Sequence, residues 1–433
     1  MARREGPILS ERAAPSGAEP SGAAPSGAEP PVALYVHTPF CVSRCPYCDF
    51  VVYAGAAARG PRSRRAAYLA ALETEIRLRA DAVDERFGPP GSPGRPTLTS
   101  LYLGGGTPSL LGGDAIAGIL GIVGERFGLA PGAEVTLEVN PAPAERGSAN
   151  RWQMVGVNRL SIGAQSMVDA EIRTLGRRHV AADVAATVAE AREAGIGSLS
   201  IDLLYDVPGQ TLDSWAGSLE GALTLRPDHL SLYALTLDDP DEERLTGDLG
   251  DHLPTTTGAR RWRERARQSQ DEDRAAAMYE MACARLAGDR WHGYEISNWA
   301  RPGHESCHNL AYWERRPYEA VGPGAHAFDG VVRRWNAADL DAYIAALAPG
   351  DATAPRFPPG GQESIDPRTA EHERLILGLR LARGIPRAWV DAAPFRATAP
   401  WALESGLLEI AADRLRLTTR GRLLSNELFA RLV

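Results

Sequence analysis

The sequence predicts an α/β protein built on a partial (β/α)6 barrel, followed by a smaller α+β domain of winged-helix type. Six short apolar runs, each typical of a buried parallel strand, alternate with stretches of helical periodicity over the first half of the chain. This alternation favours a parallel sheet with helices outside it. Six units are fewer than the eight of a closed barrel. A doubly wound sheet remains the competing topology, because one sequence does not reveal strand order.

The elements follow in a regular order. The predicted strands are 33–37, 100–103, 135–139, 159–162, 198–204 and 229–233. The predicted helices between them are 65–79, 114–127, 181–194 and 212–224, with a shorter one near 150–155. After residue 239 the pattern changes to helices at 260–267 and 275–287 and a single strand at 293–298. We therefore expect a core domain over 31–265 and an extension of the barrel over 266–348.

The two ends of the chain have different compositions. Residues 1–30 repeat a Pro-Ser-Gly-Ala pattern that has nothing to bury, which predicts a disordered tail. Residues 349–364 are rich in proline and predict a linker. Residues 365–433 predict a helix at 370–383, a hairpin from 407–410 and 415–418, and a final helix. This is the predicted winged-helix-like domain, which we expect to act as a structural cap.

Composition excludes several functions. The 433 residues carry 47 basic and 55 acidic side chains, so the net charge of -8 argues against nucleic acid as a main partner. Every basic residue is arginine, which excludes a P-loop lysine, a Schiff-base lysine and a pyridoxal-phosphate anchor. We find no apolar run long enough to span a membrane and no secretory signal, so we expect a cytoplasmic protein.

Three of the five cysteines lie within eight residues, directly after the first predicted strand: Cys41, Cys45 and Cys48. Thiolates suit iron–sulfur clusters and zinc. Three cysteines can bind three irons of a cubane and leave the fourth iron open to a small molecule. The alternatives are a zinc site completed by His37 or Asp49, or three unrelated buried thiols.

Other chemically suggestive residues follow the strands. A glycine-rich turn, 104–107, comes after the second strand, where glycine allows a close backbone approach. Glu138 lies at the end of the third strand, Gln165 follows the fourth, Asp202 lies in the fifth, and Ala234 follows the sixth. Ligands of βα proteins bind at the carboxyl ends of strands, so we expect these groups to converge on the face that carries the cysteines. Each could instead be a cap or turn residue.

Together these motifs resemble a known superfamily. The Cys-x3-Cys-x2-Cys loop followed by Gly-Gly-Gly-Thr-Pro is similar to the signature of radical S-adenosylmethionine (SAM) proteins. Segments 35–41, 156–166, 175–179 and 202–211 narrow the resemblance to the anaerobic coproporphyrinogen III oxidase family and its sister, the HemW-type heme chaperones. The resemblance covers nearly the whole chain from Val32 onward.

The resemblance implies cofactors and ligands. A 4Fe–4S cluster on the three cysteines would bind SAM at its open iron. The positions that match SAM-contacting residues are Tyr35, Tyr47, Gly105, Gly106, Thr107, Glu138, Gln165, Arg177, Asp202 and Ala234. Among them, Arg177 could hold a carboxylate with its planar fork.

Two features distinguish the chaperone from the oxidase. Phe50 stands where the oxidase has a fourth cysteine, and residues 307–313 resemble the H-N-x-x-Y-W motif of HemW. The resemblance implies that His308 binds heme, the alternative being a structural histidine packed against Tyr312 and Trp313. Ligation of heme by the Cys307 thiolate is a further option. A standard covalent attachment is excluded, because the C-x-x-C-H pattern is absent.

The family reading implies a chaperone that binds heme and passes it to respiratory proteins, with an electron donor for the cluster. Contact with membranes would then be transient and would come through the acceptors. The resemblance assigns no catalytic residue. The alternative is an enzyme, an oxygen-independent coproporphyrinogen III oxidase that performs a radical SAM oxidative decarboxylation in heme biosynthesis. A regulator that binds DNA through the C-terminal domain is a third class.

Overall fold

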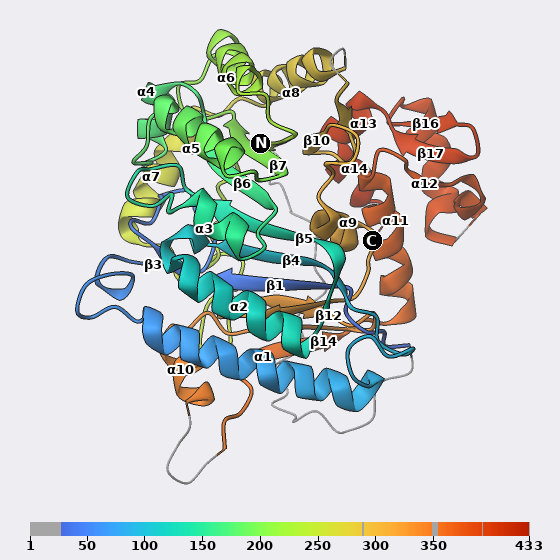
Figure 1. The fold of residues 1–433 in the computed structure, drawn as a ribbon. Coiled ribbons are helices and arrows are strands. Elements are labelled where there is room, and N and C mark those ends of the chain that lie inside the picture. Colours follow the sequence, from blue (N-terminus) through green and yellow to red (C-terminus); the bar gives the residue numbers. More distant parts are fainter. Residues whose placement is uncertain (1–26, 288–289, 349–353, 392, 433) are drawn as a thin grey trace.

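Six parallel strands form the centre of the molecule. The computed structural model describes residues 27–287, 290–348, 354–391 and 393–432 (Figure 1). The central strands are adjacent in chain order: β1 (Ala33–Thr38), β4 (Leu98–Gly105), β5 (Leu129–Val139), β6 (Arg159–Gln165), β7 (Ser198–Tyr205) and β8 (His229–Ala234). This order excludes the doubly wound alternative, in which the order reverses at a switch point. It confirms the predicted α/β class with a parallel core.

Helices that connect successive strands cover one side of the sheet, as right-handed crossovers in strand order require. They are α1 (Arg65–Phe87), α2 (Gly113–Arg126), α3 (Ala149–Met154), α4 (Asp169–Thr174), α5 (Ala181–Glu193) and α6 (Leu212–Thr224). One large apolar cluster lies between these helices and the strands, and it includes Trp152 and Trp215, both at most 1% exposed. This core fixes the strands, and therefore fixes the groups at their carboxyl ends.

Further strands extend the sheet at both edges. Beside β1, β11 (Tyr318–Val321) pairs in parallel, and β12 (His326–Phe328), β13 (Val332–Asn336) and β14 (Gly360–Ser364) follow in antiparallel order. Beside β8 lie β10 (Asn298–Ala300) and then β9 (His292–Gly293). Between these strands the chain forms α7 (Thr257–Arg267), α8 (Glu272–Leu286), α9 (Cys307–Trp313) and α10 (Leu340–Leu347).

These edges correct two sequence predictions. The single strand predicted over 293–298 is wrong, because the chain turns there and forms two short antiparallel strands, β9 and β10. Part of the predicted linker 349–364 is structured, since residues 360–364 form β14 and pair with β13. Residues 349–353 of that linker and residues 1–26 of the predicted tail lie outside the described residues. Short edge strands have no periodicity of their own, so only their pairing partners define them.

The C-terminal residues form a separate small core. Helix α11 (Pro367–Arg380) is followed by β15 (Ile385–Pro386), α12 (Ala393–Glu404), the hairpin β16 (Leu408–Ala411) and β17 (Arg414–Leu417), and the short helices α13 (Thr419–Leu423) and α14 (Ser425–Phe429). The three strands pair in the order β15-β17-β16 and cover their own apolar cluster. The predicted first helix and hairpin are present, the predicted final helix is instead the two short helices α13 and α14, and β15 and α12 were not predicted.

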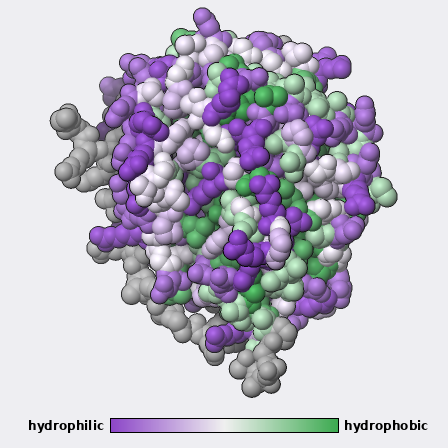
Figure 2. Space-filling view, turned by 90° about the vertical axis from the view of Figure 1, so that its left-hand side faces the viewer, coloured by the Kyte–Doolittle hydropathy of each residue, from purple (hydrophilic) through white to green (hydrophobic). Residues whose placement is uncertain are grey.

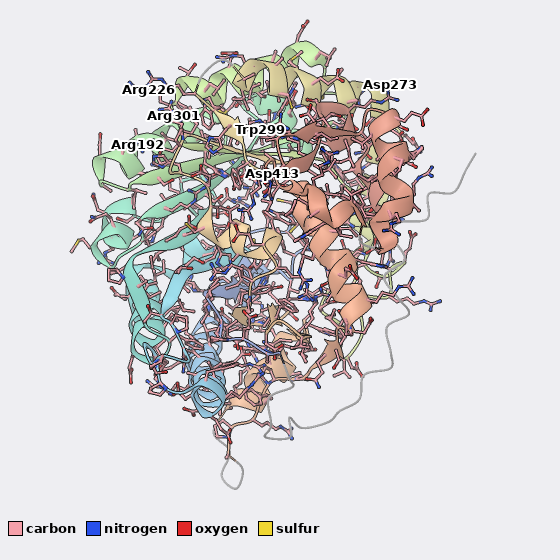
Figure 3. The ribbon with its side chains drawn as sticks, turned by 90° about the vertical axis from the view of Figure 1, so that its right-hand side faces the viewer. Arg192, Arg226, Asp273, Trp299, Arg301 and Asp413 are labelled. Atoms are coloured by element: carbon pink, nitrogen blue, oxygen red, sulfur yellow. The ribbon has the colours of Figure 1, made fainter. Side chains whose placement is uncertain are left out.

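At the amino end of the barrel strands, one carboxylate ties the connections together. Asp228 accepts hydrogen bonds from the Leu199 backbone (3.0 Å) and the Arg192 guanidinium (2.6 Å), and its carbonyl accepts from the Arg301 backbone (2.9 Å). Arg192, Arg226 and Arg301 lie close together at this end in Figure 3.

In the part of the chain that the structure describes, no helix combines the length and the apolar character needed to cross a membrane.

Candidate functional site

The cysteine loop lies beyond the carboxyl end of β1. Strand β2 (Phe40–Cys41) pairs in parallel with β3 (Tyr53–Ala54), and this pair closes the loop that carries Cys41, Cys45 and Cys48. All three thiols are free and partly buried. Figure 2 faces the side on which β3 lies in Figure 1, and it shows apolar residues near the centre of that face with hydrophilic residues around them.

The glycine turn packs directly against this loop. The backbone N–H groups of Gly106 and Thr107 donate to the carbonyls of Thr38 and Phe40, both at 2.7 Å, and the Cys41 Sγ lies 3.1 Å from the Thr107 hydroxyl. Gly105 has φ of +103°, and a Cβ there would lie 2.5 Å from the His37 ring. The close approach that these glycines permit is therefore to the neighbouring strand, and it fixes the cysteine loop.

A cation faces the cysteines from the other side. The Arg177 guanidinium places one nitrogen 3.8 Å from the Cys45 Sγ and donates through the other to the Gly163 carbonyl at 2.8 Å. Its Nε is buried without a hydrogen-bond partner. Among the described residues, no carboxylate forms an ion pair with this guanidinium. A buried cation in this position fits an anionic group bound beside the thiols.

The three thiols are the type of ligand that iron–sulfur clusters use. Among the described residues, no three His, Cys, Asp or Glu side chains converge on one ion, as a mononuclear zinc site would require. A cubane instead binds each thiolate on a different iron. The fourth ligands considered for zinc are also engaged, because His37 bonds Tyr35 and Val51 and Asp49 pairs with an arginine. Burial raises the pKa of Cys41 to about 12, so ionisation of this thiol requires a compensating positive charge, such as a bound metal centre would supply.

The next strand end holds a carboxyl group with two donors. The Tyr102 hydroxyl donates to one Glu138 oxygen and the Gly105 backbone N–H to the other, both at 2.9 Å. Burial raises the pKa of Glu138 to about 7, although both hydrogen bonds act to lower it. Tyr35 lies beside this pair, with its ring centroid 6.1 Å from that of Tyr102. The site therefore offers a carboxyl whose charge changes near neutral pH.

Strands β7 and β6 carry two further predicted residues, Asp202 within β7 and Gln165 at the end of β6. Asp202 accepts from the hydroxyls of Ser161 (2.8 Å) and Ser200 (3.0 Å), and burial raises its pKa. Gln165 has φ of +67°, where the register between β6 and β7 shifts. A Cβ built on Gly163 would lie 2.9 Å from the Gln165 amide and 3.1 Å from Arg177, so these two side chains flank one glycine.

The remaining predicted residues lie around the same end of the sheet. Ala234 is exposed at the last residue of β8, opposite Tyr205 of β7. Tyr47 lies within the cysteine loop with its ring centroid 6.4 Å from that of Trp262. Direct contacts join the glycine turn to Glu138 and Arg177 to Cys45, whereas Asp202 bonds serines of β6 and β7. Contact of these residues with SAM stays a prediction.

The imidazole of His308 is buried and hydrogen-bonded at both ring nitrogens. Its side chain is buried, Nδ1 lies 3.0 Å from the Ser100 hydroxyl, and Nε2 lies 2.8 Å from the Tyr312 hydroxyl. Burial lowers the pKa of His308 to about 3, so the ring is neutral. Both ring nitrogens have hydrogen-bond partners, so His308 links α9 to β4, and heme binding by His308 stays a prediction.

A cavity of about 460 Å³ lies beside the start of α9, at the amino end of the strands. Its lining includes Cys307, which is exposed, and His304, whose Nδ1 lies 3.1 Å from the Ser198 hydroxyl. Glu134 and Glu305 also line the cavity, so it contains a thiol, an imidazole and two carboxylates. Glu134 anchors the same segment by accepting from the backbone N–H groups of Cys307 and His308.

Sequence reasoning missed two polar groups near the cysteines. Asp251 bridges His252 (2.9 Å) and His326 (2.8 Å), and these bonds hold the pKa of its carboxyl well below the ordinary range although burial opposes the shift. Arg263 of α7 is 1% exposed and bonds the cysteine loop. The segment 257–267 shows only an arginine-rich helical pattern, so no local signal marks Arg263 as buried.

The fold and the cysteine loop together define a protein of the radical SAM class. Residues 35–220 match the Radical SAM superfamily, and residues 365–424 match the HemN C-terminal domain. The solved structure of coproporphyrinogen III oxidase HemN from Escherichia coli superposes with a TM-score of 0.73, covering 93% of this chain and 90% of that one at 24% identity. At this identity the likeness establishes the fold.

Proteins of similar sequence identify the family within this class. The heme chaperone HemW of Mycobacterium tuberculosis is 37% identical over 396 residues, which cover 92% of this chain and 93% of that protein. The HemW proteins of Bacillus subtilis and Escherichia coli are each 30% identical over 91% and 92% of this chain. The chain belongs to the HemW-like family of radical SAM proteins, as the motifs predict.

Proposed function

We propose that this protein is a heme chaperone that binds heme, carries a 4Fe–4S cluster with SAM, and transfers heme to acceptor proteins. The observation that carries this proposal is the 37% identity to a HemW heme chaperone over 92% of the chain. The cluster would receive electrons from a separate donor, and respiratory heme proteins are the acceptors that we propose. Contact with a membrane would then come only through such acceptors.

The residues of the chain have distinct roles in this proposal. The three cysteines hold the cluster, and Arg177 beside Cys45 balances negative charge there. The cluster supplies a one-electron reductant and an iron that chelates SAM. Glu138 and Asp202, both oriented by hydroxyl donors, would accept hydrogen bonds from the amino or ribose groups of SAM.

The role of His308 has a test with two opposite outcomes. If its Nε2 ligates heme iron, the bond to Tyr312 must break first, so Tyr312→Phe should strengthen heme binding while His308→Ala weakens it. If His308 is structural, both variants lose stability and heme affinity stays unchanged. The measurement is a heme titration followed at the Soret band, with melting curves for each variant.

Other imidazoles and a thiol serve as comparison sites in the same titration. His252→Ala tests the histidine whose Nδ1 is bound to Asp251, the arrangement that orients metal-ligating histidines. Cys307→Ser and His304→Ala test the cavity beside α9. Loss of heme binding in only one of these variants would identify the iron ligand.

Transfer and catalysis separate the chaperone from the oxidase. The chaperone should hold heme stoichiometrically and pass it to an apo-acceptor when the two are mixed, which the acceptor's absorbance reports. The oxidase should convert coproporphyrinogen III to vinyl product when supplied anaerobically with reductant and SAM. Vinyl product without heme transfer would contradict the proposed function.

A further inference from the structure

One buried arginine from outside the barrel holds the cysteine loop. Arg263 lies on α7, about 215 residues after the cysteines, and its side chain is 1% exposed. Its Nε donates to the Pro46 carbonyl at 3.0 Å, and one terminal nitrogen donates to the Cys48 carbonyl at 3.3 Å and to Asp49 at 2.5 Å. The other terminal nitrogen bonds the Asp238 carbonyl.

Arg263 differs from the other arginines of α7 in being buried. The other arginines of the helix remain at least partly exposed, and Arg263 and Ala266 are its buried residues. Burying a guanidinium is costly unless its donors are satisfied and its charge is paired. Here the cysteine loop supplies two carbonyls and a carboxylate. The neighbouring Trp262 adds a hydrogen bond to the Thr174 carbonyl at 3.1 Å, which ties α7 to the barrel.

Arg263 lies outside the segment that matches the superfamily, whereas its partners in the cysteine loop lie inside it. The match to radical SAM proteins ends at residue 220, well before α7. Within the loop itself, the Cys48 backbone N–H donates to the Cys45 carbonyl at 3.2 Å. Arg263 thus fixes one peptide unit between the second and third cysteines and the unit that directly follows the third, by long-range bonds that the loop cannot form alone.

We propose that Arg263 is a positioning residue that holds the Cys45–Cys48 loop ready for the cluster and, with Asp49, sets the charge beside it. The proposal depends on the cluster assigned above to the three cysteines. A planar fork can reach the carbonyls and the carboxylate together, which a lysine cannot. A positive charge near the cluster stabilises its reduced form, so loss of that charge should lower the reduction potential.

The test uses the full chain, reconstituted with iron and sulfide without oxygen. Two quantities are measured, the rate at which a ferrous chelator removes the cluster and the reduction potential from an EPR-monitored titration. R263Q should lose its cluster about tenfold faster. At the wild-type midpoint potential, its ratio of reduced to oxidised cluster should fall about tenfold, which is about 59 mV for a one-electron couple.

Three further variants separate geometry from charge. R263K keeps the charge but loses the fork, so it should lose the cluster faster at a potential near that of the wild type. R263Q combined with D49N removes both charges, so its potential should return toward the wild-type value while cluster loss stays fast. R260Q breaks an ion pair between the same helix and Asp239 without touching the loop, and it should match the wild type in both measurements.

Specific results would overturn the proposal. Equal rates of cluster loss in wild type, R263K and R263Q would refute the positioning role. An unchanged potential in R263Q would refute the electrostatic role. If R263Q fails to fold, R263K and the double variant decide between these outcomes. If even the wild type takes up no cluster, the failure lies with the cluster assignment and so with the proposed function.

Discussion

The raised pKa of Glu138 makes the stability of the protein depend on pH in a defined direction. The carboxyl keeps its proton to about pH 7 in the folded protein, whereas its ordinary pKa is 4.5. Between these values the folded state binds more protons than the unfolded state. The free energy of unfolding therefore falls as pH rises from about 4.5 to about 7 and is level above that.

The magnitude follows from the shift. At about 1.4 kcal/mol per pH unit, the carboxyl accounts for at most about 3 kcal/mol, because the side chain keeps some contact with solvent. Glu138→Gln cannot titrate, so it should remove this loss. The amide turns one NH2 group toward Tyr102 or Gly105, both donors, which costs about 1 kcal/mol at every pH. The variant should therefore be less stable near pH 5 and more stable near pH 8.

The assay is urea unfolding of the cluster-free protein at about pH 5 and about pH 8, followed by circular dichroism. Tyr102→Phe is the matched control, because loss of its donated hydrogen bond should raise the pKa of Glu138 further and steepen the pH dependence. A difference between Glu138→Gln and wild type that is the same at both pH values would refute the raised pKa.

Three other predictions concern the loop, the turn and the core. Cys45→Ser should nearly abolish the brown anaerobic absorbance of the reconstituted protein with an unchanged far-ultraviolet spectrum, and full cluster content would remove Cys45 from the ligand set. Gly105→Ala should cost about 1–3 kcal/mol by urea unfolding, because φ is +103° and the new Cβ meets the His37 ring; Gly118→Ala, in open space on α2, is its control. Trp215→Ala should cost about 3–5 kcal/mol in the same assay, because Trp215 is fully buried and donates to the Met278 carbonyl at 2.8 Å. A wild-type midpoint for either destabilising variant would contradict its reasoning.

Local patterns located most of the barrel. The six central strands lie within a few residues of their predicted positions, because short apolar runs that alternate with helical periodicity can be recognised without tertiary information. The strands at the edge of the sheet could not be predicted from local patterns. Strand β11 pairs in parallel with β1 across almost 300 residues of chain, and nothing in residues 318–321 reveals that partner.

Some features of the candidate site could likewise be predicted from the sequence, and others could not. The close cysteines and the glycine turn were evident, because ligand spacing and turn chemistry are properties of short segments. The occupancy of the His308 ring was not, because Ser100 lies 208 residues away and the hydrogen bond depends on how α9 packs on β4. The sequence could suggest an imidazole for iron but not that both of its nitrogens are already bonded.

By itself, the sequence determined the class of fold, the cysteine loop and the family to which the chain belongs. Only the tertiary structure decided the strand order, the occupied His308 ring and the bond from Arg263 to the loop. The physical reason is that periodicity and motif spacing are encoded over a few residues. The partner of a buried polar group is set instead by which distant segments the packed core brings into contact.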